Sequence, residues 1–151
     1  MSKIIRWNTP FTDKQYPAVE FLTAIEQGKY NALQILVAPF GVDKYPKYLI
    51  HFGQALAFTC MEEANAPQIT FDEELEKDIE PRLSAYQYID SPWLKSYESQ
   101  ILFTPTEQLG LGYFSHFMIF GGDNNVEVIT TFEPSIEMIE QKRLFKIERE
   151  L

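Results

Sequence analysis

The stretch YFSHFMIFGGDNNVEVITTF, residues 113–132, decides the fold that we expect. Aromatic and β-branched residues flank the segment 121–125, Gly-Gly-Asp-Asn-Asn, whose residue types tolerate the positive φ angles of tight turns. Pairing Phe120 with Val126 would align three further cross-strand pairs, rich in aromatic and β-branched residues, on one sheet face: Met118 with Val128, His116 with Thr130, and Phe114 with Phe132. The stretch therefore predicts a β-hairpin.

The glycine pair of this stretch does not indicate a nucleotide-binding loop. It lacks the third glycine of a dinucleotide fingerprint. A strand rather than a helix is expected to follow, so no helix N-terminus would be available to hold a phosphate.

Two further segments have the composition of strands. Leu33 to Pro39 is an apolar run that ends at Pro39 and Gly41. From Tyr48 to Glu62 the even positions are mostly bulky and apolar while the odd positions are mostly small, which places one face on the core. Gly53 in the interior indicates a bend, so this segment could be two strands.

Helical patterns occur elsewhere in the chain. Pro17 to Gln27 has apolar residues at i, i+3, i+4 and i+7, and Thr70 begins a capping-box pattern before a second helix that ends at Pro81. Ser91 and Pro92 predict the start of a short helix reaching about Glu98. For residues 83–89 and 135–151 the sequence leaves helix and strand both open. We expect a single α+β domain over residues 1–151, with an antiparallel sheet of about five strands and two to four helices packed mainly on one face.

Charge and cysteine content narrow the classes of function. The net charge is -9, and the segment from Glu62 to Glu80 holds eight acids against one base. Such a surface disfavours nucleic acid and anionic membranes but suits a basic protein partner. A single cysteine and no secretory signal favour the cytoplasm.

Few residues have the spacing of a catalytic or metal site. His51 and His116 are the two histidines, and no HxxxH or CxxC pair occurs, so we expect no metal and no cofactor. Cys60 ends an apolar face and is expected to be a buried hydrophobe. The candidate partner-binding residues are the acids that follow the long strand and two nearby tyrosines: Glu62, Glu63, Asp72, Glu73, Glu74, Glu76, Tyr86 and Tyr88.

Three pieces taken together carry a resemblance: HFGQALAFTCMEE (51–63), DSPWLKSY (90–97) and SHFMIFGGDNNVEVIT (115–130). The set resembles small uncharacterised bacterial α+β domains, some of which look like immunity proteins that neutralise toxins. The resemblance implies the fold more than an activity.

We therefore expect a non-catalytic interaction or binding domain rather than an enzyme. Its most concrete form is an immunity-type inhibitor whose acidic face meets a basic protein. The alternative is a small-molecule-binding protein or an enzyme that uses His51 and His116 on neighbouring strands. A homodimer formed through an edge strand also stays open.

Overall fold

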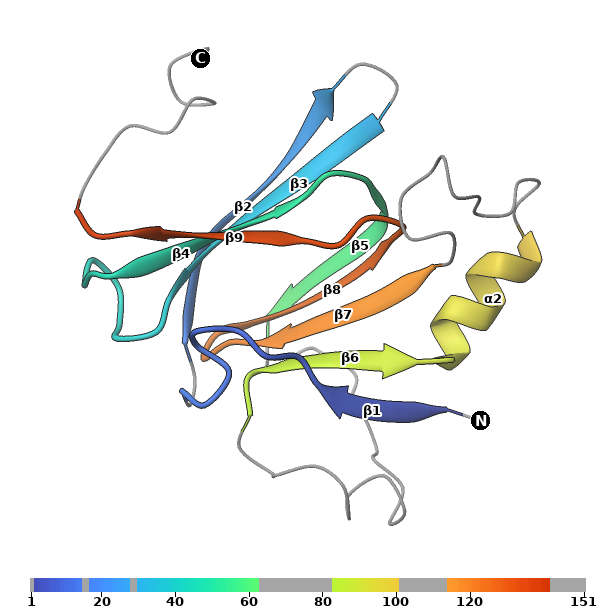
Figure 1. The fold of residues 1–151 in the computed structure, drawn as a ribbon, viewed down its shortest axis with the longest axis horizontal. Helices are drawn as coiled ribbons and strands as arrows, with labels where there is room; N and C mark the ends of the chain where they lie inside the picture. The colour runs from blue at the N-terminus through green and yellow to red at the C-terminus, as the bar shows by residue number, and fades with distance from the viewer. Residues whose placement is uncertain (1, 15–16, 28–29, 63–82, 101–113, 142–151) are drawn as a thin grey trace.

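The structure is a computed structural model that describes residues 2–14, 17–27, 30–62, 83–100 and 114–141 (Figure 1). Within these residues it consists of strands and one helix. In chain order they are β1 (Lys3–Arg6), β2 (Ala18–Gln27), β3 (Tyr30–Ala38), β4 (Lys47–Phe52), β5 (Ala55–Glu62), β6 (Ala85–Ile89), α2 (Pro92–Gln100), β7 (Ser115–Phe120), β8 (Asn124–Thr130) and β9 (Ser135–Ile139).

The strands form two antiparallel sheets that pack face to face. Sheet A has the order β1-β6-β7-β8-β5, and sheet B has the order β2-β3-β4-β9. The core between them contains Leu33, Ile35 and Ile50 from sheet B, and Phe117 and Val128 from sheet A. Figure 1 shows α2 beside the ends of β6 and β7, where Leu94 packs on the outer face of sheet A.

This architecture corrects the expected α+β fold: the described residues hold one helix and two sheets, not one sheet covered by two to four helices. The largest error is the helix predicted over residues 17–27, which is the strand β2. A β-bulge between Val19 and Phe21 shifts the pairing by one residue, so apolar residues in this strand do not alternate and their spacing imitates a helix. The open segment 83–89 contains β6, and the open segment 135–151 contains β9 in its first part, while residues 142–151 lie outside the described residues.

Other expectations are confirmed. The long segment from Tyr48 to Glu62 is two strands, because the chain crosses from sheet B to sheet A at Gly53 and Gln54. The short helix after Ser91 is α2, and its first turn is capped by the Ser91 hydroxyl, which accepts a 3.0 Å hydrogen bond from the Leu94 N–H. The helix predicted after Thr70 lies outside the described residues.

The hairpin of the opening stretch is confirmed, with its register one residue away from the expected one. Phe120 faces Asn125, and residues 121–123 connect β7 to β8. A Cβ on Gly121 would lie 2.7 Å from the Asn124 carbonyl oxygen and 2.9 Å from that of Pro17. The turn is therefore held against the chain just before β2, and the Gly122 N–H donates to the Pro17 carbonyl at 3.0 Å. This close backbone approach requires glycine at 121.

Candidate functional site

The two histidines lie on opposite outer faces of the sandwich. On β4, Ile50 and Phe52 fill the core, so His51 between them faces outward, where its Nδ1 lies 3.5 Å from the Gln34 amide nitrogen. On β7, Phe117 fills the core and His116 faces the outer side of sheet A. The structure does not bring the two imidazoles together, and their strands belong to different sheets.

His116 is the centre of a buried cluster and is only 2% exposed. Its Nδ1 lies 2.7 Å from the Ser91 hydroxyl oxygen and its Nε2 lies 2.8 Å from Glu127 Oε1. The Tyr88 ring stacks on the imidazole at 5.6 Å, and the Trp93 ring meets it edge-on at 5.0 Å. We call these five residues the His116 cluster. It joins α2 and its cap to three strands of sheet A.

The hairpin register explains why this cluster was not foreseen. With the expected register His116 would face Thr130, but the observed one places it opposite Ile129. Residues two apart on a strand share a face, so Glu127 on β8 comes within reach of the imidazole. The signal in the sequence was the acid of Val126-Glu127-Val128, a charge inside an apolar strand.

A serine, a histidine and a glutamate in contact have the composition of a nucleophilic triad, but the geometry differs. In a serine hydrolase triad the hydroxyl meets Nε2 and the carboxylate meets Nδ1, whereas here the two partners are exchanged. The Ser91 side chain is fully buried and already accepts the Leu94 N–H at the cap of α2. This arrangement can fix α2 to sheet A. Ser91, which caps α2, also contacts His116 Nδ1, and His116 Nε2 contacts Glu127 on β8.

Tyr86 and Tyr88 were expected to be near the surface. Tyr86 is 4% exposed and packs edge-on against Phe120 at 5.4 Å, and burial raises the pKa of its hydroxyl. Tyr88 is half-buried within the His116 cluster. Tyr86 therefore has almost no side-chain surface to offer to a partner, and one face of the Tyr88 ring stacks on the imidazole.

Of the predicted acidic face, only Glu62 lies within the described residues. It is the exposed last residue of β5, and Glu63, Asp72, Glu73, Glu74 and Glu76 lie outside them. β5 pairs only with β8 among the described strands, so it is an edge of sheet A. Phe58 and Met61 on this edge are 40% and 39% exposed. The acidic segment therefore begins at a sheet edge with uncovered apolar side chains.

Cys60 also lies on this edge and is exposed, which corrects the expectation of a buried hydrophobe. The reason is that the second half of the predicted long strand passes to the edge of sheet A, where its side chains lose cover. Partial burial still raises the pKa of the Cys60 thiol, so the reactive thiolate is disfavoured at neutral pH.

A buried ion pair on sheet B was missed by the sequence analysis. Lys47 Nζ donates to Glu20 Oε2 at 2.6 Å, and their side chains are 6% and 14% exposed. Glu20 Oε1 accepts the Asp43 N–H at 2.8 Å. Burial alone would lower the pKa of Lys47, but the hydrogen bond and negative charge of Glu20 outweigh it, so the pKa is raised. The only signal in the sequence was the acid within the apolar segment 18–22, which marks the bulge of β2.

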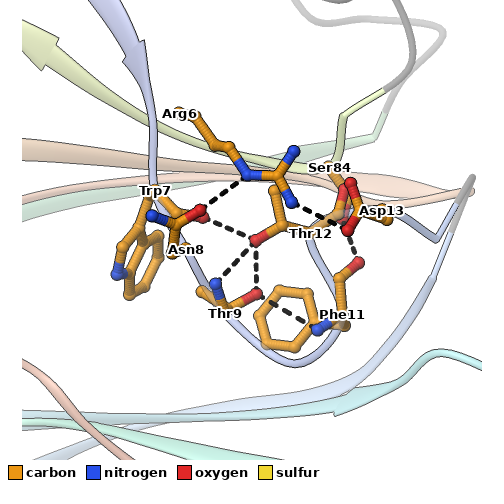
Figure 2. Close-up of polar contacts among 8 residues, drawn as sticks. All are labelled: Arg6, Trp7, Asn8, Thr9, Phe11, Thr12, Asp13 and Ser84. Atoms are coloured by element: carbon orange, nitrogen blue, oxygen red, sulfur yellow. Dashed lines mark hydrogen bonds and ion pairs between the residues drawn. The ribbon is translucent and has the colours of Figure 1, made fainter.

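The segment after β1 forms a second polar network that sequence reasoning missed (Figure 2). The Arg6 guanidinium contacts Asn8 Oδ1 at 2.6 Å and Asp13 Oδ2 at 2.7 Å. The Thr12 hydroxyl donates to the Trp7 carbonyl at 2.5 Å, and the Ser84 hydroxyl donates to the Phe11 carbonyl at 2.8 Å. These bonds close the loop and set the Trp7 and Phe11 rings into the core.

Searches for wider similarity gave no match among protein-family models, curated proteins or solved structures. In the portion of the chain that the structure describes, no three His, Cys, Asp or Glu residues gather as a metal site would require. The described residues likewise contain no helix with the length and apolar character needed to cross a membrane.

Proposed function

We propose that this chain is a non-catalytic, cytoplasmic interaction domain that binds a basic protein partner. The proposed surface begins at the β5 edge and continues into the acidic segment that follows Glu62. The observation that carries this proposal is the β5 edge itself: among the described strands β5 pairs on one side only, with β8, and the side chains of Phe58 and Met61 on it are exposed.

The proposed binding mechanism combines attraction at a distance with apolar contact. Eight acids between Glu62 and Glu80 would attract a positively charged partner and raise its association rate. On contact, an extended segment of the partner would pair with β5 and cover Phe58 and Met61. An immunity-type inhibitor of a basic toxin is the most concrete form of this proposal.

The alternative of an enzyme or small-molecule-binding protein has less support. It needs His51 and His116 in one pocket, and they lie on opposite outer faces. His116 is also enclosed by the Tyr88 and Trp93 rings, which leave a substrate no approach to its nitrogens.

The test is affinity purification from the native cell with the wild-type chain and two variants. Charge reversal (Glu73→Lys, Glu74→Lys, Glu76→Lys) and removal of the apolar side chains (Phe58→Ser, Met61→Ser) are each expected to lose the same basic protein. Met138→Ser is the matched control, because Met138 is 51% exposed on β9 of the other sheet.

Two outcomes would contradict the proposal. One is recovery of the same proteins by all variants. The other is a purified dimer that the Phe58→Ser, Met61→Ser variant converts to a monomer in sedimentation velocity, which would assign the β5 edge to a second copy of this chain.

A further inference from the structure

The strands at the sheet edges differ in how well they resist pairing with another chain. Among the described strands, sheet A ends at β1 and β5, and sheet B ends at β2 and β9. Charged side chains and bulges are the usual features that oppose an added strand. β1 begins with Lys3 and ends with Arg6, β2 has Glu20 at its bulge, and β9 has a central glutamate. By contrast, residues 57–61 of β5 are paired in regular register with β8 and include no charged residue.

The side chains of β5 form two rows with different surroundings. Phe58 lies opposite Val128, which belongs to the core, so the row of Phe58 faces the core side of sheet A. Thr59 lies opposite Glu127, so the row of Thr59 faces the outer side. A strand added to β5 would therefore have an apolar neighbour at one position and a small polar neighbour with a carboxylate behind it at the next.

The carboxylate of Glu127 is held in one position by a buried partner. His116 Nε2 lies 2.8 Å from Glu127 Oε1, and His116 is 2% exposed. Because a carboxylate only accepts hydrogen bonds, Nε2 is the donor of this bond. The Glu127 side chain is nevertheless 29% exposed. A fixed carboxylate that is still open to solvent can bind a cation with a small loss of side-chain entropy.

The charges around Glu127 are mainly negative. Residues 53–62 and 114–133, which include β5, β7 and β8, contain no lysine or arginine, and they contain four acids: Glu62, Asp123, Glu127 and Glu133. The helix α2, which packs on the same face, adds one base and one acid, Lys95 and Glu98. A basic segment therefore meets complementary charge at this edge, whereas a second copy of this chain would bring like charges together.

We propose that the segment bound at β5 is an amphipathic strand in which apolar residues alternate with arginine or lysine. This inference rests on the proposed function and names the kind of segment that the basic partner supplies. Its apolar residues would lie beside Phe58, and one basic side chain would extend over Thr59 to Glu127. The added strand would lie two strand spacings, about 10 Å, from β8, and the small side chain of Thr59 leaves this route open. Glu127 then determines specificity, and the His116 cluster positions it.

The experiment uses the full chain and three blocked peptides of seven residues. In the first, valine alternates with arginine. The second has the same residues in two blocks, and the third has citrulline, which is neutral and of similar shape, in place of arginine. We expect the alternating arginine peptide to slow amide hydrogen exchange in β5. By fluorescence anisotropy it should bind at least about tenfold more tightly than the block peptide, which has equal charge but no alternation.

Variants of the chain test the role of Glu127 separately from its role in folding. Glu127→Gln keeps an oxygen that can accept the Nε2 hydrogen bond but removes the charge, so the Kd of the arginine peptide should rise about threefold to tenfold. The affinity difference between the arginine and citrulline peptides should shrink by the same factor. Glu140→Gln is the matched control, because it changes the net charge equally at an exposed position after β9 of the other sheet. It should change the Kd by less than about twofold.

The results separate this inference from the proposed function. The inference is overturned if the alternating and block peptides bind equally, if no peptide slows exchange in β5, or if Glu127→Gln and Glu140→Gln leave the same difference between the arginine and citrulline peptides. The proposed docking edge would still stand in each case, provided that Phe58→Ser, Met61→Ser loses the basic protein in the affinity purification. If that variant retains the basic protein and also binds the arginine peptide as the wild type does, both proposals fail.

Discussion

The His116 cluster and the Glu20–Lys47 pair both contain buried polar side chains, but they differ in how much of the surrounding structure is exposed to solvent. In each, a side chain with little exposure to water forms hydrogen bonds with residues from separate elements of the chain. In the His116 cluster the imidazole is enclosed by α2 and the rings of Tyr88 and Trp93, and the Glu127 side chain is 29% exposed. At the ion pair the polar groups are covered, but the loop between β3 and β4 that they fix exposes Phe40 and Val42. His116, which the sequence analysis named as a candidate ligand-site residue, therefore lies in the region that is less accessible to solvent.

The largest expected effect comes from breaking the ion pair on one side. Lys47→Met leaves the Glu20 carboxylate buried without its counterion, which should lower the free energy of unfolding by about 3–5 kcal/mol. Urea unfolding measures this. The double variant Glu20→Met, Lys47→Met should recover most of the loss, and the exposed Lys14→Met should change stability by less than about 0.5 kcal/mol. If Lys47→Met lowers the free energy of unfolding by less than about 1 kcal/mol, the Glu20 carboxylate is hydrated in the variant and the prediction is contradicted.

The second prediction compares the two histidines. His116→Leu keeps the volume but leaves Ser91 and Glu127 without their imidazole partner, so it should cost about 1–3 kcal/mol. Among the described residues, His51 has a long 3.5 Å side-chain contact with Gln34 on a half-buried site, so His51→Leu should cost less than about 0.5 kcal/mol. Equal losses in urea unfolding would mean that the cluster does not anchor α2.

A smaller effect is expected from the cap of α2. Ser91→Ala removes the acceptor of the Leu94 N–H and one partner of His116, at a cost of about 1–2 kcal/mol. Faster amide hydrogen exchange in the first turn of α2 would localise this loss. The exposed Ser99→Ala in the same helix should leave both exchange and stability unchanged, and a matching loss there would contradict the capping role.

The smallest effect is a pH dependence that isolates Lys47. Its pKa in the folded protein is raised above the ordinary 10.5, so the folded chain binds this proton more tightly than the unfolded chain. The stabilisation is therefore complete below pH 10.5 and is lost as the pH rises through the raised value. The stability difference between the wild type and Lys47→Met should stay constant from about pH 8 to about pH 10 and then shrink. Because the raised pKa values of Tyr86 and Tyr97 are common to both chains, they cancel in this difference.

The parts of the fold that could be predicted were those decided by local pattern. The hairpin of β7 and β8, the bend at Gly53 and the cap at Ser91 each depend on residues close in sequence. The helix predicted over residues 17–27 was wrong because a single bulge changes the phase of the apolar residues. A one-residue error in hairpin register was enough to hide the contact between His116 and Glu127.

The exposed surfaces were predictable only in part. The acidic segment is visible from composition, but its contact with a sheet edge depends on where the chain changes sheets. The exposure of Phe40 and Val42 gave no signal, because exposure of an apolar residue depends on what packs against it. Lys47 pairs with Glu20 only because the bulge of β2 lies near the start of β4, which is a fact of tertiary structure.

The strand order also has a consequence for how the chain is assembled on the ribosome. Sheet B gains three of its four strands, β2, β3 and β4, from consecutive segments, so this meander is available early in synthesis. In sheet A, β1 pairs with β6 among the described strands, so Lys3 cannot pair with Ile89 until 86 further residues have been synthesised. We therefore expect β1, the first of the described strands in chain order, to be among the last to be incorporated, and a slow step when the second sheet docks on the first.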